Sequence, residues 1–203
     1  LGIIGTAGRG EDINSLSAPL YDRMRSVALG VSERHGATSL VSGGAAWADH
    51  LVVSLFHLSL MGDGTGLPLT LHLPCPFDLK DRQFDPMIKD GRTANYYHKR
   101  FSDKTGWDTL GELADAILIR DKCLTTVSKG FFARNMLVAR QANILLAFTF
   151  GDGSPSSLNT PTTFPRGSLA KDCGLKDGGT AHTWDKSSAD VKIHVTLPRT
   201  FES

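Results

Sequence analysis

Three short glycine-rich turns are the places where the backbone of this chain could bind a ligand. They are the turn from Gly5 to Gly10, the pair Gly43-Gly44 and the run Gly178-Gly179-Thr180. Glycine lets a backbone approach a ligand closely and adopts positive φ values. Where such a turn opens a helix, the free N–H groups and the helix dipole favour an anion. One turn alone is more often structural, but three together favour a phosphate-binding cradle.

None of these turns carries a standard catalytic or nucleotide-binding motif. The first reads G-x-x-G-x-G instead of G-x-G-x-x-G, and no G-x-x-x-x-G-K-[ST] run is present. Ser42 cannot be the nucleophile of a G-x-S-x-G elbow, because Leu40 stands at the first glycine position. The histidines lack H-E-x-x-H spacing and the three cysteines form no C-x-x-C pair, so no metal site is expected.

Apolar segments precede or follow the turns in a regular rhythm of strand, turn and helix. The apolar runs predict strands at residues 1–5, 39–41, 67–73, 144–150 and 191–197. Apolar spacings of three and four predict helices at 17–35, 45–61, 95–101, 110–118, 128–143 and 177–189. This alternation predicts a Rossmann-like α/β fold, a mostly parallel sheet with helices on both faces. Ligands of such sheets bind beyond the carboxyl ends of the strands.

Composition points to one domain over residues 1–203. Hydrophobic residues make up 40% of the 203 residues and charged residues 21%, which is ordinary globular usage. The segment 152–176 is rich in Gly, Ser, Pro and Thr without apolar periodicity, so we expect a flexible polar insertion there. The formal net charge of +1 weighs against nucleic acid and acidic membranes as partners.

Cysteine usage and the absence of targeting signals bear on the compartment. The odd number of widely spaced cysteines fits a reducing environment, and no apolar run approaches the ~20 residues of a membrane span. The chain opens with the strand-like run from Leu1 to Gly5, without a recognisable signal peptide. We therefore expect a cytoplasmic protein and a domain taken from a longer one.

Ordered sequence blocks connect the chain to a known superfamily. The run Val41-Ser42-Gly43-Gly44-Ala45, followed by Asp49, resembles the "SGGA…D" signature of the SLOG superfamily. That superfamily includes the YpsA-like proteins, the DprA/Smf DNA-processing proteins and the Lonely-guy phosphoribohydrolases. A Gly-Thr-x-Gly loop after the first strand, Arg134-Asn135 and Gly178-Gly179-Thr180 occur in the same order as in the superfamily. The resemblance covers nearly the whole chain except 152–176 and is greatest to the YpsA-like branch.

The resemblance implies a pocket for a nucleotide or a nucleotide-derived molecule. Its motifs match Thr6, Gly8, Ser42, Gly43, Gly44, Arg134, Gly179 and Thr180. Glycine amides and hydroxyl groups at these positions could donate to phosphate oxygens, and Arg134 offers a two-pronged guanidinium fork. Asp49 could accept a ribose hydroxyl, or it could satisfy the first-turn amides of its own helix.

Two departures from the superfamily affect the expected chemistry. Trp47 stands where many relatives have glycine, and it could stack on a base or, as we favour, belong to the core. Thr183 replaces the glutamate with which the Lonely-guy enzymes support cleavage of the N-glycosidic bond. His182 could act as an acid or base, although pocket-wall or surface histidines are more common. The catalytic residues stay unknown, with Arg134, Asp49 and His182 as candidates.

These observations favour a binding module, with other classes still open. The leading expectation is a nucleotide-binding or sensor domain of a larger protein, with a small-molecule ligand and no further cofactor. A nucleotide hydrolase or phosphoribohydrolase acting on an N-glycosidic or phosphate bond is the first alternative. A structural domain with a vestigial pocket is the second, and a nucleic-acid-binding module is disfavoured. Whether the chain forms a homo-oligomer stays open.

Overall fold

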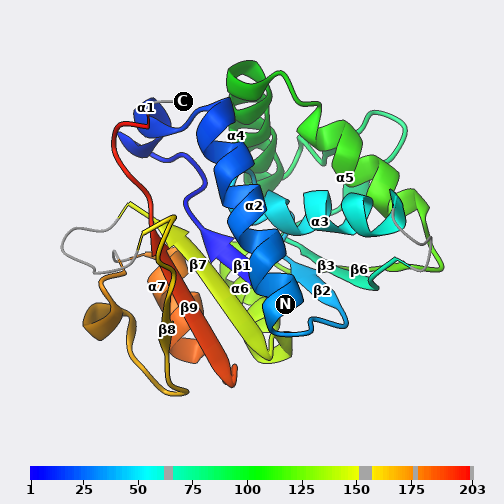
Figure 1. The fold of residues 1–203 in the computed structure, drawn as a ribbon. Helices are drawn as coiled ribbons and strands as arrows, with labels where there is room; N and C mark the ends of the chain where they lie inside the picture. The colour runs from blue at the N-terminus through cyan, green and yellow to red at the C-terminus, as the bar shows by residue number, and fades with distance from the viewer. Residues whose placement is uncertain (62–65, 151–156, 176–177, 202–203) are drawn as a thin grey trace.

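A seven-stranded, mostly parallel sheet organises the chain in the computed structural model, which describes residues 1–61, 66–150, 157–175 and 178–201 (Figure 1). The strand order is β6-β3-β2-β1-β7-β9-β8, and only the edge strand β8 runs antiparallel to its neighbour. The strands are β1 (Gly2–Gly5), β2 (Leu40–Ser42), β3 (Leu69–Leu73), β6 (Cys123–Val127), β7 (Ile144–Thr149), β8 (Thr162–Phe164) and β9 (Val191–Thr196). The predicted Rossmann-like α/β class is confirmed.

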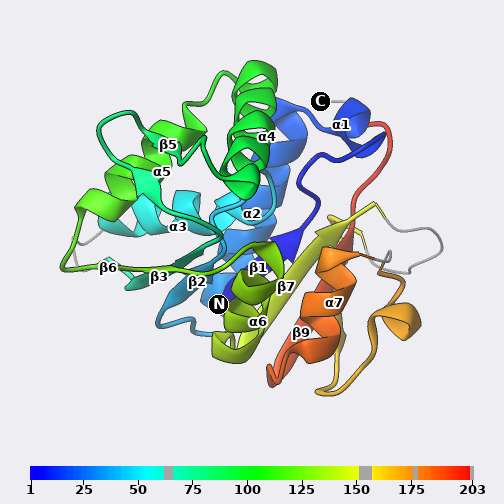
Figure 2. The same ribbon diagram turned by 180° about the vertical axis from the view of Figure 1, so that it is seen from behind.

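Helices cover both faces of the sheet and bury a separate core on each. One face carries α2 (Ala18–Arg34), α3 (His50–Met61) and α5 (Thr109–Leu118), and α4 (Lys89–Thr105) packs against α5 beyond the carboxyl ends of the strands. The other carries α6 (Phe131–Gln141) and α7 (Gly179–Lys186), which come to the front in Figure 2. The short elements are α1 (Asp12–Ser15), the hairpin β4 (Phe77–Asp78) with β5 (Gln83–Phe84), and the 3-10 helix η1 (Ala170–Cys173). No described helix is long and apolar enough to cross a membrane.

Local sequence explains where the helix over residues 18–34 begins and ends. Ser17 caps α2, because its hydroxyl accepts a hydrogen bond from the backbone N–H of Leu20 at 3.4 Å. Apolar side chains at spacings of three and four, including Met24 and Val31, face the core. Gly36 follows the helix with a φ of 58°, a left-handed conformation that ends it.

The third helix begins five residues later than the sequence predicts. Residues 45–49 do not continue into α3, because Gly44 has a φ of 66° and Trp47 a φ of 62°. Two left-handed residues so close together cannot belong to a right-handed helix. The chain instead makes an irregular turn over the end of β2, which brings Asp49 beside the strand ends before α3 starts at His50.

The C-terminal half differs from expectation in two places. Strand β6 lies in a region for which no strand is predicted, because this short edge strand has only one buried residue, Cys123. The described part of the expected insertion, residues 157–175, contains β8 and η1 and buries Leu158 and Leu175. The indole Nε1 of Trp184 donates to the Ser168 carbonyl at 3.0 Å and helps to hold this segment on the domain. Residues 152–156 and 176 lie outside the described ranges.

The strand order creates a switch point at the centre of the sheet. From β1 the chain winds outward through β2, β3 and β6, and it then returns to β7 on the other side of β1. The loops that leave the carboxyl ends of β1 and β7 therefore diverge to opposite sides. A crevice forms at such a point in open α/β sheets.

Candidate functional site

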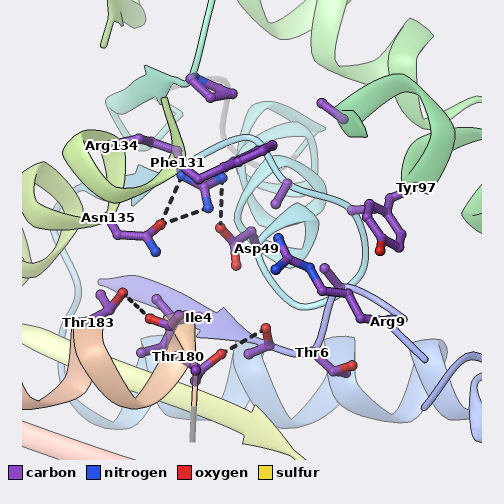
Figure 3. A pocket seen from close by; sticks show the side chains of 18 of the residues that line it. Ile4, Thr6, Arg9, Asp49, Tyr97, Phe131, Arg134, Asn135, Thr180 and Thr183 are labelled. Atoms are coloured by element: carbon purple, nitrogen blue, oxygen red, sulfur yellow. Dashed lines mark hydrogen bonds and ion pairs between the residues drawn. The ribbon is translucent and has the colours of Figure 1, made fainter. Parts of the chain in front are cut away.

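A cavity of about 610 Å³ lies at this switch point (Figure 3). Its wall is built by the loops after β1, β2, β6 and β7, by the start of α7 and by one face of α4. The volume falls within the range of small-molecule and cofactor sites. Residues from nearly the whole length of the chain, from Ile4 to Thr183, thus meet in one place.

Two helices begin at the cavity without a side-chain cap. The residues that precede them, Gly130 before α6 and Gly178 before α7, have φ values of 92° and 123° and offer no side-chain oxygen. Helix N-termini present backbone N–H groups that have no partner within the helix, together with the positive end of the dipole. The cavity therefore has backbone donors in two of its walls.

Six of the nine predicted ligand-binding residues line the cavity: Thr6, Gly44, Asp49, Arg134, Gly179 and Thr180. The two threonine hydroxyls already have partners within the protein. Thr180 Oγ1 donates to the Gly5 carbonyl at 3.1 Å, and Thr6 Oγ1 donates to Asp12 Oδ2 at 3.2 Å. Thr6 Oγ1 also accepts from Gly8 N–H at 3.1 Å, so it keeps one lone pair, while Thr180 Oγ1 keeps two; both fit a ligand donor better than the phosphate oxygens for which they were predicted.

The other three predicted residues, Gly8, Ser42 and Gly43, lie behind the cavity wall and shape it. Ser42 is buried, and its Oγ donates to the Asp49 carbonyl at 2.9 Å and accepts from Gly44 N–H at 3.1 Å. A Cβ atom at Gly43 would lie 2.6 Å from the Arg134 guanidinium, and one at Gly8 would lie 3.0 Å from the Trp47 indole nitrogen. These residues permit close packing where direct ligand contacts were predicted.

Arg134 is buried, and its guanidinium is bound to its own protein. Its Nη1 donates to the Gly43 carbonyl at 2.9 Å, while Nε and Nη2 both donate to Asn135 Oδ1, at 3.0 and 2.7 Å. Nη1 also lies 3.6 Å from Asp49 Oδ2. Burial lowers the pKa of Arg134, and the nearby Asp49 opposes that shift. The fork that the sequence assigns to phosphate is therefore occupied by Asn135.

Asp49 places a carboxylate in the cavity wall that is only 10% exposed. Its distance of 3.6 Å to Arg134 is that of an ion pair without a hydrogen bond, and no described residue donates a hydrogen bond to this carboxylate. The alternative role of capping first-turn amides is therefore not seen in the described part of the chain. Burial raises the pKa of Asp49, while Arg134 and Arg9 act to lower it. This buried carboxylate is a strong hydrogen-bond acceptor, and a bound ligand could supply the donors.

The structure adds an exposed arginine and two rings to the predicted site. Arg9 lines the cavity, and its guanidinium lies 5.6 Å from the ring centre of Tyr97 and 5.9 Å from that of Phe131. It stands between Gly8 and Gly10, both with positive φ, so the glycine loop presents this side chain. The position of Arg9 between two glycines is visible in the sequence and could have indicated that this side chain belongs to the site.

The remaining candidates lie elsewhere or have structural contacts. His182 is absent from the cavity wall and packs edge-on against Phe132, with ring centres 5.5 Å apart. Thr183 borders the cavity, but its Oγ1 donates to the Gly179 carbonyl at 2.7 Å. Trp47 is fully buried and stacks on Phe101 at 4.3 Å, which confirms the favoured core assignment. Among the described residues, no three His, Cys, Asp or Glu side chains are grouped to hold a metal ion.

Comparison with known proteins shows one full-length relative and gives no function. No family model and no solved structure matches the chain. "Uncharacterized protein R261" of Acanthamoeba polyphaga mimivirus is 34% identical over an alignment 203 positions long, which covers 97% of this chain and 95% of that protein. The chain therefore belongs to the same protein family as this mimivirus protein.

Proposed function

We propose that this chain is a domain that binds a nucleotide or a nucleotide derivative. The observation that carries the proposal is the cavity at the switch point, into which the uncapped N-termini of α6 and α7 open beside the buried Asp49 carboxylate. Helix N-termini suit phosphate oxygens, and a carboxylate suits sugar hydroxyls or an amino group. Two aromatic rings in the wall, those of Tyr97 and Phe131, suit a flat base.

The same wall supports binding more than turnover. Thr183 is held by Gly179 and His182 lies outside the cavity, so neither supplies an acid or base at a ligand. One observation favours the hydrolase alternative, namely the buried Asp49 with its raised pKa, which is typical of a proton donor. Turnover is therefore the second candidate, with Asp49 as its acid.

Compartment and partners are part of the proposal. We place the domain in the cytoplasm, as a module of a longer protein with a small-molecule partner. Its three cysteines are free and buried, and its formal net charge is only +1. The charge disfavours a general affinity for nucleic acid.

The first test is a thermal-shift panel with AMP, ATP, ADP-ribose and NAD, with each mixture assayed for breakdown products. A ligand that binds the folded state raises Tm by mass action, so we expect a rise with at least one intact compound. A rise together with breakdown would establish the hydrolase, and no rise with any compound would contradict nucleotide binding.

A matched pair of variants links any shift to the cavity. Ala45 lines the cavity, whereas Ala133 is exposed on α6 outside it. Ala45→Phe fills space that a ligand would need and should abolish the shift. Ala133→Phe adds the same ring elsewhere and should keep it.

A further inference from the structure

Three described residues of the cavity wall carry a positive charge, and they differ in whether the protein already binds them. Arg134 is buried and bound to Gly43, Asn135 and Asp49. Arg9 and Lys129 are exposed, and within the described ranges neither forms a hydrogen bond or an ion pair. Among the described residues of the cavity wall, a ligand anion can therefore find an unused cation only at Arg9 and Lys129.

Arg9 is the better placed of the two. Its guanidinium rests near the rings of Tyr97 and Phe131 and points toward Asp49 in the close view (Figure 3). A guanidinium held by ring contacts keeps its N–H groups free for a phosphate, which it can bind through two parallel hydrogen bonds. Lys129 stands on the loop before α6, where it adds charge without a fixed direction.

Two further acidic groups, Asp90 and Asp12, line the same cavity. Asp90 lies beside the start of α6, since a Cβ atom at Gly130 would be 2.9 Å from its Oδ2. Asp12 borders the cavity on the side of α1 and is bound to Thr6 and Arg199. Both carboxylates repel an anion, so a phosphate in this cavity needs a cation beside it, and this again points to Arg9 as its contact.

Asp49, in contrast to Arg9, requires a ligand group that donates hydrogen bonds. Its ionised carboxylate only accepts hydrogen bonds, and no described residue supplies one. It is close enough to Arg9 for the two charges to influence each other. A ligand that satisfies both residues carries an anionic group and, a short distance away on the same molecule, hydroxyl donors.

We propose that Arg9 binds the phosphate of a ribonucleoside phosphate and that Asp49 accepts hydrogen bonds from its ribose hydroxyls. This inference rests on the proposed function and specifies its ligand class. It assigns the phosphate contact to Arg9, because the fork of Arg134 is already occupied.

The test compares ligands that differ by one group. The four ribonucleoside 5′-monophosphates AMP, GMP, CMP and UMP are measured by calorimetry, and the tightest is compared with its nucleoside and with its 2′,3′-dideoxy form. Arg9→Gln should reduce the preference for the monophosphate over the nucleoside about tenfold or more, and leave the preference for ribose over dideoxyribose unchanged. Asp49→Asn should reduce the preference for ribose over dideoxyribose and keep or increase the preference for the monophosphate, because it removes a negative charge near Arg9. Arg120→Gln changes an exposed arginine outside the cavity and should alter neither preference.

The outcomes separate this inference from the proposed function. If none of the four monophosphates binds but ATP, ADP-ribose or NAD raises Tm, this inference fails while the proposed function stands; if no compound of either panel binds, both fail. If one binds and Arg9→Gln weakens the nucleoside and the monophosphate equally, the domain still binds nucleotides but Arg9 is not the phosphate contact. An unchanged ribose preference in Asp49→Asn would likewise overturn the assignment of the hydroxyl groups.

Discussion

The guanidinium of Arg134 makes its contacts within the protein. Its guanidinium joins α6 to the turn after β2 through Gly43 and faces the buried carboxylate of Asp49. A buried ion pair adds little compared with an apolar pair of the same shape, but removal of one partner leaves an uncompensated charge. The importance of Arg134 for stability therefore depends on the presence of Asp49.

Arg134→Met should lower the free energy of unfolding by about 3 kcal/mol at neutral pH, because Asp49 is left buried and unpaired. Urea unfolding measures the change. Arg140→Met, which replaces an exposed arginine of the same helix, should change it by less than about 0.5 kcal/mol.

A double variant tests whether the unpaired charge of Asp49 causes this loss of stability. Arg134→Met combined with Asp49→Asn should recover part of the loss, since the amide carries no charge. Equal stability of the single and double variants would show that the lost contacts to Gly43 and Asn135 account for the effect.

At the scale of single residues, the sequence predicts which residues line the cavity better than it predicts the hydrogen bonds that their side chains make. Motif positions such as Gly44 and Thr180 do line the cavity, because the ends of parallel strands and the helix starts meet there. The buried position of Arg134 could not be foreseen, because its Nη1 donates to the carbonyl of Gly43, which lies 91 residues away. Arg9 was overlooked because its loop was interpreted through its glycines alone.

His98 ties together three elements. It is fully buried on α4, where its Nε2 lies 3.0 Å from the Gly44 carbonyl and its Nδ1 3.1 Å from Thr109 Oγ1 at the start of α5. The carbonyl requires a donor, so Nε2 carries the proton of a neutral ring. Burial, aided by the neighbouring His50, lowers the pKa of His98 to about 3.

This shift predicts a loss of stability in acid. Between the ordinary histidine pKa of 6.5 and a pKa of about 3, the unfolded chain binds a proton at this site and the folded chain does not. The free energy of unfolding should therefore fall as pH drops through this window, by up to about 5 kcal/mol from this one group. Urea unfolding at a series of pH values gives the slope. His98→Gln should reduce the slope by about one proton, and an unchanged slope in this variant would contradict the assignment.

At the scale of elements, most of the sheet follows from the sequence. The strands β1, β3, β7 and β9 are apolar runs and were predicted within two residues at each end. Edge strands bury little, so β6 and β8 lack this pattern and were missed. The late start of α3 was not predicted because Trp47 adopts a positive φ, which is rare for an aromatic residue.

The whole molecule keeps its three thiols away from solvent. Cys75, Cys123 and Cys173 are all free and buried, and burial raises the pKa of each, that of Cys123 to about 11. The thiolate is the reactive form, so native protein should react slowly with a disulfide reagent that releases a chromophore. In denaturant three equivalents should react rapidly.

A variant with one surface cysteine calibrates this measurement. Thr38 is exposed after α2, so Thr38→Cys should add one fast equivalent to the native protein. A fast equivalent in the unmodified chain would mean that one of its three thiols opens to solvent without global unfolding.

The cavity wall has a consequence for synthesis on the ribosome. It joins Thr180 to Gly5 by a hydrogen bond between residues 175 positions apart, and α7 supplies one whole side. A nascent chain can collapse around β1, β2 and β3 long before that contact is available. Until α7 emerges, the polypeptide thus has a partial sheet with an open crevice. The cavity is complete only after α7 has left the exit tunnel.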